Sequence, residues 1–188
     1  MNKASLARII TAHRRSYVHQ ATGRRLVSDH LSFELLPVLV AAGAVALILT
    51  GFDLPSQVRI GALALVGLTG AMLFAAFLFV SATAHGVAAR MSQIDNSPRE
   101  WSQRRTLLGE MAANSAYGVL VGSVAGVLFV VGSGSGWFAL ADGLAIGMGV
   151  HLALVFAMVM KRLMALTEGT LNETLKIRER EPEQEIAA

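Results

Sequence analysis

The chain has 188 residues, no cysteine, 54% hydrophobic and 15% charged residues, and a formal net charge of +3. A soluble domain carries about 25% charged residues, and a small one has too much surface for its volume to bury so many apolar side chains. Composition therefore excludes an ordinary soluble protein, and the missing cysteines exclude disulfides, thiolate metal sites and cysteine nucleophiles.

The first segment, residues 1–30, is predicted to form a basic amphipathic helix on the cytoplasmic side. Leu6, Ile9, Ile10, His13 and Tyr17 share one helical stripe, and the arginines lie on other sides. Such a helix either lies in the headgroup layer of an anionic membrane or packs on the protein's own helices. The sequence leaves both alternatives open.

Four apolar segments follow, at residues 35–52, 60–84, 111–132 and 137–160. Each is long enough to cross about 30 Å of hydrocarbon as an α-helix. Helices are expected because unpaired backbone groups are costly in lipid. The sequence therefore predicts an all-α integral membrane four-helix bundle, with one transmembrane hairpin at 31–85 and a second at 111–162.

Two helical extensions are predicted outside the spans. The connection at 86–110 is expected to form two helical pieces joined near residues 95–98, and the fourth helix is expected to continue into the C-terminal segment 163–188. This segment carries an apolar seam, with which copies of the chain would contact one another, and ends in a charged tail. The seam consists of Leu163, Met164, Thr167, Leu171 and Leu175.

The distribution of basic residues predicts the orientation of the spans. Six of the 16 Lys and Arg residues precede the first span, four lie between the second and third, five follow the fourth, and only Arg59 falls on the other side. The positive-inside rule then places both termini in the cytoplasm. The Arg-rich, Ala/Gly/Val-rich composition suggests the inner membrane of a bacterium. Candidate contacts for a cytoplasmic partner or for lipid are Arg14, Arg15, Arg24, Arg25, Arg99, Arg104 and Arg105.

Small residues four positions apart mark close helix packing in membranes. The packing is either within one protomer or between subunits of a homo-oligomer, and both readings stay open. The glycines concerned are Gly118, Gly122 and Gly126 in the third span and Gly143 and Gly147 in the fourth.

Polar groups inside membrane segments are candidates for function because they are costly there. They are His30, Glu34, His85, Asn114, Asp142 and His151. Asp142 and His151 are nine residues apart on one helix, point to nearly opposite faces and cannot pair with each other. His151 is either a neutral histidine bonded to a neighbouring helix or a group for proton passage or a pH switch.

His30, Glu34 and His85 would converge if the first two spans were neighbours. That convergence would form either a hydrogen-bonded cluster or a divalent metal site. We predict no metal and no cofactor.

No nucleotide-binding, zincin or nucleophile-elbow motif occurs, so we expect no enzyme, and no groove for direct nucleic-acid binding is indicated. The first functional hypothesis is an oligomeric channel-like or effector subunit that is controlled from the cytoplasmic side. The second is a membrane anchor or scaffold that recruits a soluble cytoplasmic protein, and the third is a metal- or haem-binding membrane subunit. In architecture the chain loosely resembles small four-span membrane components of bacterial antiviral defence systems, a resemblance that implies a depolarising or partner-recruiting subunit and assigns no residue.

Overall fold

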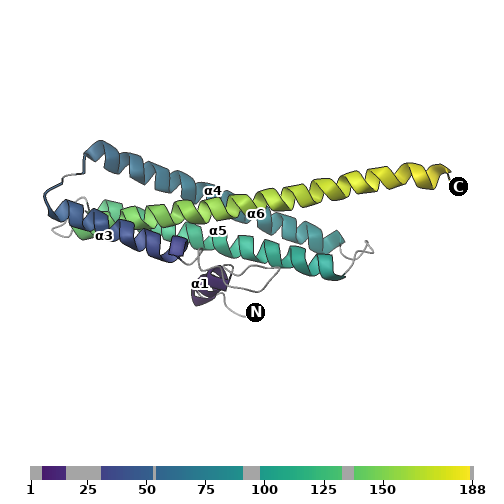
Figure 1. The fold of residues 1–188 in the computed structure, drawn as a ribbon, viewed down its shortest axis with the longest axis horizontal. Helices are drawn as coiled ribbons and strands as arrows, with labels where there is room; N and C mark the ends of the chain where they lie inside the picture. The colour runs from purple at the N-terminus through teal and green to yellow at the C-terminus, as the bar shows by residue number, and fades with distance from the viewer. Residues whose placement is uncertain (1–5, 16–30, 53, 91–97, 133–137, 187–188) are drawn as a thin grey trace.

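The computed structural model describes residues 6–15, 31–52, 54–90, 98–132 and 138–186. No strand occurs in these ranges, which confirms the all-α prediction. In chain order the elements are helix α1 (Leu6–Arg15), the π-helical turn η1 (Leu31–Leu35), and helices α3 (Leu36–Leu49), α4 (Ser56–Arg90), α5 (Pro98–Gly132) and α6 (Phe138–Ile186) (Figure 1).

Four helical segments are long and apolar enough to cross a membrane, which confirms the predicted number of spans. They are Leu31–Leu49, Ser56–Gly86, Arg104–Gly132 and Phe138–Glu168. Large apolar side chains stay exposed on their outer faces, for example Leu65 (64%) on α4 and Val127 (61%) on α5. Lipid is the solvent that accepts such surfaces, so the protein is a multi-pass membrane protein.

The bundle has two unlike ends (Figure 1). At the hairpin end, α3 is followed by α4 and α5 is followed by α6 after short connections. At the other end, which we call the extension end, α4, α5 and α6 continue beyond the start of α3. The expected helical extensions are present on the described parts of α4, α5 and α6, although the predicted joint near residues 95–98 lies largely outside the described residues.

Helices α5 and α6 form the central antiparallel pair, α4 packs mainly on α5, and α3 packs on α6. Along the described residues α3 makes no contact with α4, so the expectation that the first two spans are neighbours is wrong. Apolar faces are equally compatible with lipid and with another helix, and the short connection between α3 and α4 therefore does not force them together. Small residues on α6 decide instead where α3 docks.

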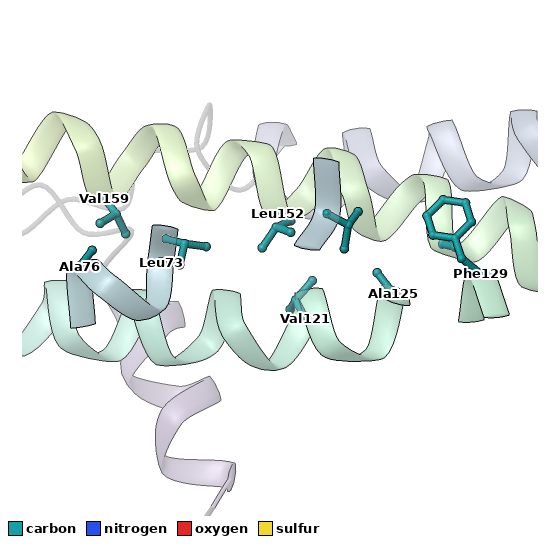
Figure 2. Packing of buried hydrophobic residues seen from close by; sticks show 9 residues of the cluster. Leu73, Ala76, Val121, Ala125, Phe129, Leu152 and Val159 are labelled. Carbon is teal, nitrogen blue, oxygen red and sulfur yellow. The ribbon is translucent and has the colours of Figure 1, made fainter. Parts of the chain in front are cut away.

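The apolar core lies between α4, α5 and α6. Figure 2 shows the side chains that fill it: Leu73, Ala76, Val121, Ala125, Phe129, Leu152 and Val159. Most of these residues are branched aliphatics or alanines, which interdigitate with few voids. The interior of one protomer is therefore filled over this stretch.

The glycine stripe of α5 faces this core. A Cβ built on Gly118 would collide with Leu73 of α4, and a Cβ on Gly122 would lie 3.4 Å from Leu152 of α6. Gly126 has more space, since the nearest atom, on Leu63, would be 3.9 Å away. All three glycines thus lie against helices of their own chain.

The two glycines of α6 seat α3. A Cβ on Gly147 would lie 2.6 Å from the Cβ of Ala41 and 2.7 Å from the carbonyl oxygen of Pro37. A Cβ on Gly143 would collide with Val45 and lie 3.1 Å from the carbonyl oxygen of Ala41. Backbone atoms cannot move aside as a flexible side chain does, so only glycine permits this approach.

Beyond α3, the three long helices keep packing on one another. Val80, Leu108 and Met111 form a second buried cluster against which Leu163 and Leu166 of α6 pack. Next to it, Glu110 of α5 and Arg162 of α6 form an ion pair with a 3.2 Å separation. This region fixes how α5 and α6 enter the extension end.

Candidate functional site

His151 on α6 is bound at both ring nitrogens by neighbouring helices. Its Nδ1 lies 2.8 Å from the carbonyl oxygen of Phe33, and its Nε2 lies 3.0 Å from the hydroxyl of Tyr117. Since a carbonyl oxygen only accepts, Nδ1 carries the proton and donates to Phe33. In the neutral ring Nε2 then accepts from the Tyr117 hydroxyl. His151 is thus bonded to neighbouring helices, and a role in proton passage or as a pH switch stays a prediction.

The backbone around Phe33 leaves its carbonyl oxygen without the usual α-helical donor. In an α-helix the Phe33 carbonyl would accept from the N–H of residue 37, but residue 37 is proline and has none. The backbone forms a π-helical turn at Leu31–Leu35 just before it. Such turns often occur at functional sites. Pro37 thereby makes the Phe33 carbonyl available to the His151 ring.

His13 reaches the same place from α1. It is 2% exposed, its Nδ1 lies 2.8 Å from Asn114 Oδ1, and its ring stacks on Tyr117 with centroids 3.9 Å apart. Burial lowers the pKa of His13 from 6.5 to about 4. The Asn114 bond opposes this shift, while His151, Arg162 and Arg14 add to it. The ring is therefore neutral at neutral pH, and α1 packs on the protein's own helices through it.

Tyr117 is the centre of the group that we call the His–Tyr cluster: His13, Asn114, Tyr117, His151 and the Phe33 carbonyl. Its ring meets His151 edge-on, with centroids 5.6 Å apart at 89°. Asn114, His13 and His151 stood out in the sequence, whereas Tyr117 did not. Its position three residues after Asn114, on the same face of one helix, was the available signal.

A cavity of about 310 Å³ adjoins the cluster between α1, η1, α3, α5 and α6. Arg14 and Glu34 stand at its rim, with Arg14 Nε 3.5 Å from Glu34 Oε1. Both side chains are more than one third exposed, at 66% and 45%. An ion pair of that kind contributes little to stability. The predicted basic contact Arg14 is thus part of the site.

Asp142 belongs to a different place, at the hairpin end. It is fully buried, and its Oδ2 accepts from Arg59 of α4 at 2.6 Å. It does not pair with His151, as their nine-residue separation predicts. Along α6 the pair lies nine residues, about 13 Å, from His151.

The predicted convergence of His30, Glu34 and His85 does not hold for the described members. His85 Nδ1 lies 2.6 Å from the carbonyl oxygen of Ser81 on its own helix, whereas Glu34 faces Arg14. His30 lies outside the described residues. Within the ranges that the structure describes, no three His, Cys, Asp or Glu side chains are grouped to hold a metal ion.

The other predicted basic contacts are distributed along the extension end. Arg105 is exposed and lines a shallow hollow together with Ala12 and Glu110, and Arg104 is partly buried nearby. Arg15 and Arg99 lie on α1 and α5, and Arg24 and Arg25 lie outside the described residues.

Comparison of the chain with protein-family models, with curated proteins and with solved structures found no match.

Proposed function

We propose that this protein is a membrane anchor that recruits a soluble cytoplasmic partner through the extended end of α6. The observation that carries the proposal is the length of α6, which continues to Ile186 beyond the rest of the bundle (Figure 1). Leu163 and Leu166 still pack on α5, but Thr167 and Glu168 are already exposed.

About 20 residues of α6, roughly 30 Å of helix, therefore extend past its packed part. Most helical stability in proteins comes from packing of an apolar stripe. The sequence supplies such a stripe at Leu171 and Leu175. A partner helix docked there would bury it.

The outer faces of the spans support an anchor rather than a pore. Between Ile60 and Phe79 of α4 the large exposed side chains are apolar, and they include Leu65, Leu68, Met72, Phe74, Leu78 and Phe79. Copies that enclosed a conducting path would need a polar face toward that path. The filled core between α4, α5 and α6 leaves no path through that stretch of a single protomer either.

The distribution of Lys and Arg supports a cytoplasmic position for the extension end. Fifteen of the 16 basic residues precede the first span, connect the second and third, or follow the fourth. In a bacterial cell this orientation would place the α6 extension in the cytoplasm, below the inner membrane.

The proposal is tested by affinity purification of the full chain in mild detergent. We expect a stoichiometric soluble protein that is lost from the double variant Leu171→Asp/Leu175→Asp. The matched control, Thr170→Asp/Asn172→Asp, adds the same two charges beside the stripe and should keep the partner.

A preparation without any soluble partner would contradict the proposal. If the stripe variant then changed the mass of a homo-oligomer in light scattering, the stripe would instead join copies of this chain. Conductance of that oligomer in planar bilayers would support the channel hypothesis.

A further inference from the structure

The cavity beside the His–Tyr cluster changes character along its length. At one end its walls are polar, from His13, Arg14, Glu34, Tyr117 and His151. Farther along they are apolar and come from three helices: Pro37, Val38, Ala41, Val121, Leu144 and Met148. Seven residues separate Glu34 from Ala41 on α3, which corresponds to about 10 Å of helix.

The polar end points toward the extension end of the bundle. α3 runs from Glu34 toward the hairpin end, and α6 runs the opposite way, so Leu144 is the deeper residue and His151 the shallower one. Glu110 forms its ion pair with Arg162 next to the second buried cluster, in the direction of the extension end. It is only four residues from Asn114, about 6 Å along α5. The His–Tyr cluster therefore lies toward the extension end of the bundle, close to the charged residues Glu110 and Arg162.

The apolar part of the cavity opens sideways. Val38 is 62% exposed, Leu144 is 41% exposed and Ile10 is 39% exposed, although all three line the cavity. In a membrane-spanning bundle these surfaces face hydrocarbon. The cavity is thus reached from the bilayer, with its charged rim at the headgroup level.

We propose that the cavity binds one acyl chain of a phospholipid from the leaflet at the extension end, with the phospholipid head beside Arg14 and Glu34. The cavity is polar on the side of the extension end and apolar farther inside. A phospholipid in that leaflet has its head and its acyl chains in the same sequence. The volume of about 310 Å³ is at the small end of ligand sites, which suits one chain and not two. α1 borders the cavity through Ile10, His13 and Arg14.

The head, and not the chain, sets the preference of the site. Lipid tails are as apolar as leucine, so moving a chain from the bilayer into the cavity gains little. An Arg guanidinium binds a phosphate well, and a carboxylate accepts hydrogen bonds from an ammonium group. Because the Arg14–Glu34 pair is exposed, it rearranges at low cost. The two charges fit a phosphoethanolamine head better than a phosphoglycerol head.

Native mass spectrometry of the full chain with equimolar phosphatidylethanolamine and phosphatidylglycerol tests the site. We expect one retained phosphatidylethanolamine per protomer, and about tenfold lower retention in Val38→Trp, whose ring fills the cavity. Val127→Trp is the matched control, since Val127 is similarly exposed but lies outside the cavity. Equal retention by the two variants would overturn the proposal.

The identity of the occupant is checked with a benzophenone amino acid in place of Leu144, irradiated after exchange into lipid-free detergent. An adduct with the mass of a phospholipid supports the site. An adduct with another part of this chain or with a second protein would show that a polypeptide fills the cavity, and the proposal would fall.

Charge variants test the head separately. Glu34→Gln should abolish the preference for phosphatidylethanolamine over phosphatidylglycerol, and Arg14→Gln should weaken retention of both lipids. An unchanged lipid ratio in Glu34→Gln would refute the assignment of the head. None of these measurements involves the α6 extension, so their outcome is independent of the proposed anchor function.

Discussion

Arg59 of α4 and Asp142 of α6 are joined by a 2.6 Å hydrogen-bonded ion pair across 83 residues of sequence. Asp142 is fully buried, whereas Arg59 retains 24% exposure. Arg59 is the one basic residue that falls on the other side of the predicted topology. Its charge is compensated by the Asp142 carboxylate of α6.

The Arg59–Asp142 pair predicts unequal effects of its two single variants. Arg59→Met leaves a buried carboxylate uncompensated and should destabilise the bundle by about 3–5 kcal/mol. Asp142→Asn should cost less, because its amide oxygen still accepts from Arg59 and Arg59 reaches solvent. Thermal unfolding in detergent measures both variants.

The double variant Arg59→Met/Asp142→Leu serves as the control for that prediction. It removes both charges together and should recover most of the lost stability. If it is as unstable as Arg59→Met alone, the loss comes from packing and not from the orphaned charge.

The seat of α3 on α6 predicts a sharp difference between two nearby glycines. Gly147→Ala pushes a methyl group against Ala41 and the Pro37 carbonyl, and should cost about 1–3 kcal/mol and loosen α3. Gly149→Ala should be tolerated, since its Cβ would lie 3.7 Å from Val66. Hydrogen exchange of the α3 amides reports the difference. Equal protection of the α3 amides in both variants would show that the contact of Gly147 with Ala41 and Pro37 has room for a methyl group.

His13 predicts that the docking of α1 weakens in acid. Its pKa is 6.5 when released and about 4 when docked, so docking favours the neutral ring. The free energy that His13 contributes to docking is fully present above pH 6.5. It decreases as the pH falls from 6.5 to 4 and changes no further below pH 4. At its full extent the change is about 3 kcal/mol. The charged neighbours Arg14 and Arg162 act in the same direction.

A fluorescent label measures this release of α1. The chain has no cysteine, so Leu6→Cys provides a unique attachment point on an exposed position of α1. Label mobility should rise between pH 6.5 and pH 4 in this background and stay flat in the added variant His13→Gln. The same titration in both proteins would assign the effect to another group.

Tyr117 predicts separable roles for its ring and its hydroxyl. Tyr117→Phe keeps the stack on His13 but leaves the Nε2 of His151 without its donor, which should cost about 1–3 kcal/mol. Tyr117→Ala removes both contacts, and α1 should detach at neutral pH. Thermal unfolding together with the Leu6→Cys label distinguishes the two outcomes. Detachment of α1 in Tyr117→Phe would show that α1 is held through the Tyr117 hydroxyl and not through the stacking of its ring on His13.

The span count was predictable because hydrocarbon imposes a length and a polarity on every crossing segment. The neighbours of each helix were not predictable, because hydropathy does not show which helix an apolar face contacts. α3 was expected beside α4 but packs on α6. Gly143 and Gly147 were identified as packing residues, but a small residue shows only that something comes close. The Cβ contacts name that neighbour as α3.

The His–Tyr cluster was half predictable for a related reason. His151 and Asn114 stood out because polar groups are costly inside a span, but their partners come from distant segments. Periodicity placed His13 on the apolar stripe of α1 and could not connect it with a residue 101 positions away. Tyr117 was overlooked because its ring reads as an ordinary apolar side chain, although its hydroxyl needs a partner when buried.

Helix α6 is unbroken for 49 residues, about 73 Å, from the Asp142 pair through His151 to the distal stripe. A continuous hydrogen-bonded rod pivots without bending much. A swing of about 10° in the roughly 30 Å arm beyond Leu166 would move its tip by roughly 5 Å. Because Leu163 and Leu166 still pack on α5, a force applied at Leu171 and Leu175 acts on a lever whose fulcrum is this last packed turn. Through His151, the same rod holds the backbone turn that borders the lipid-facing cavity.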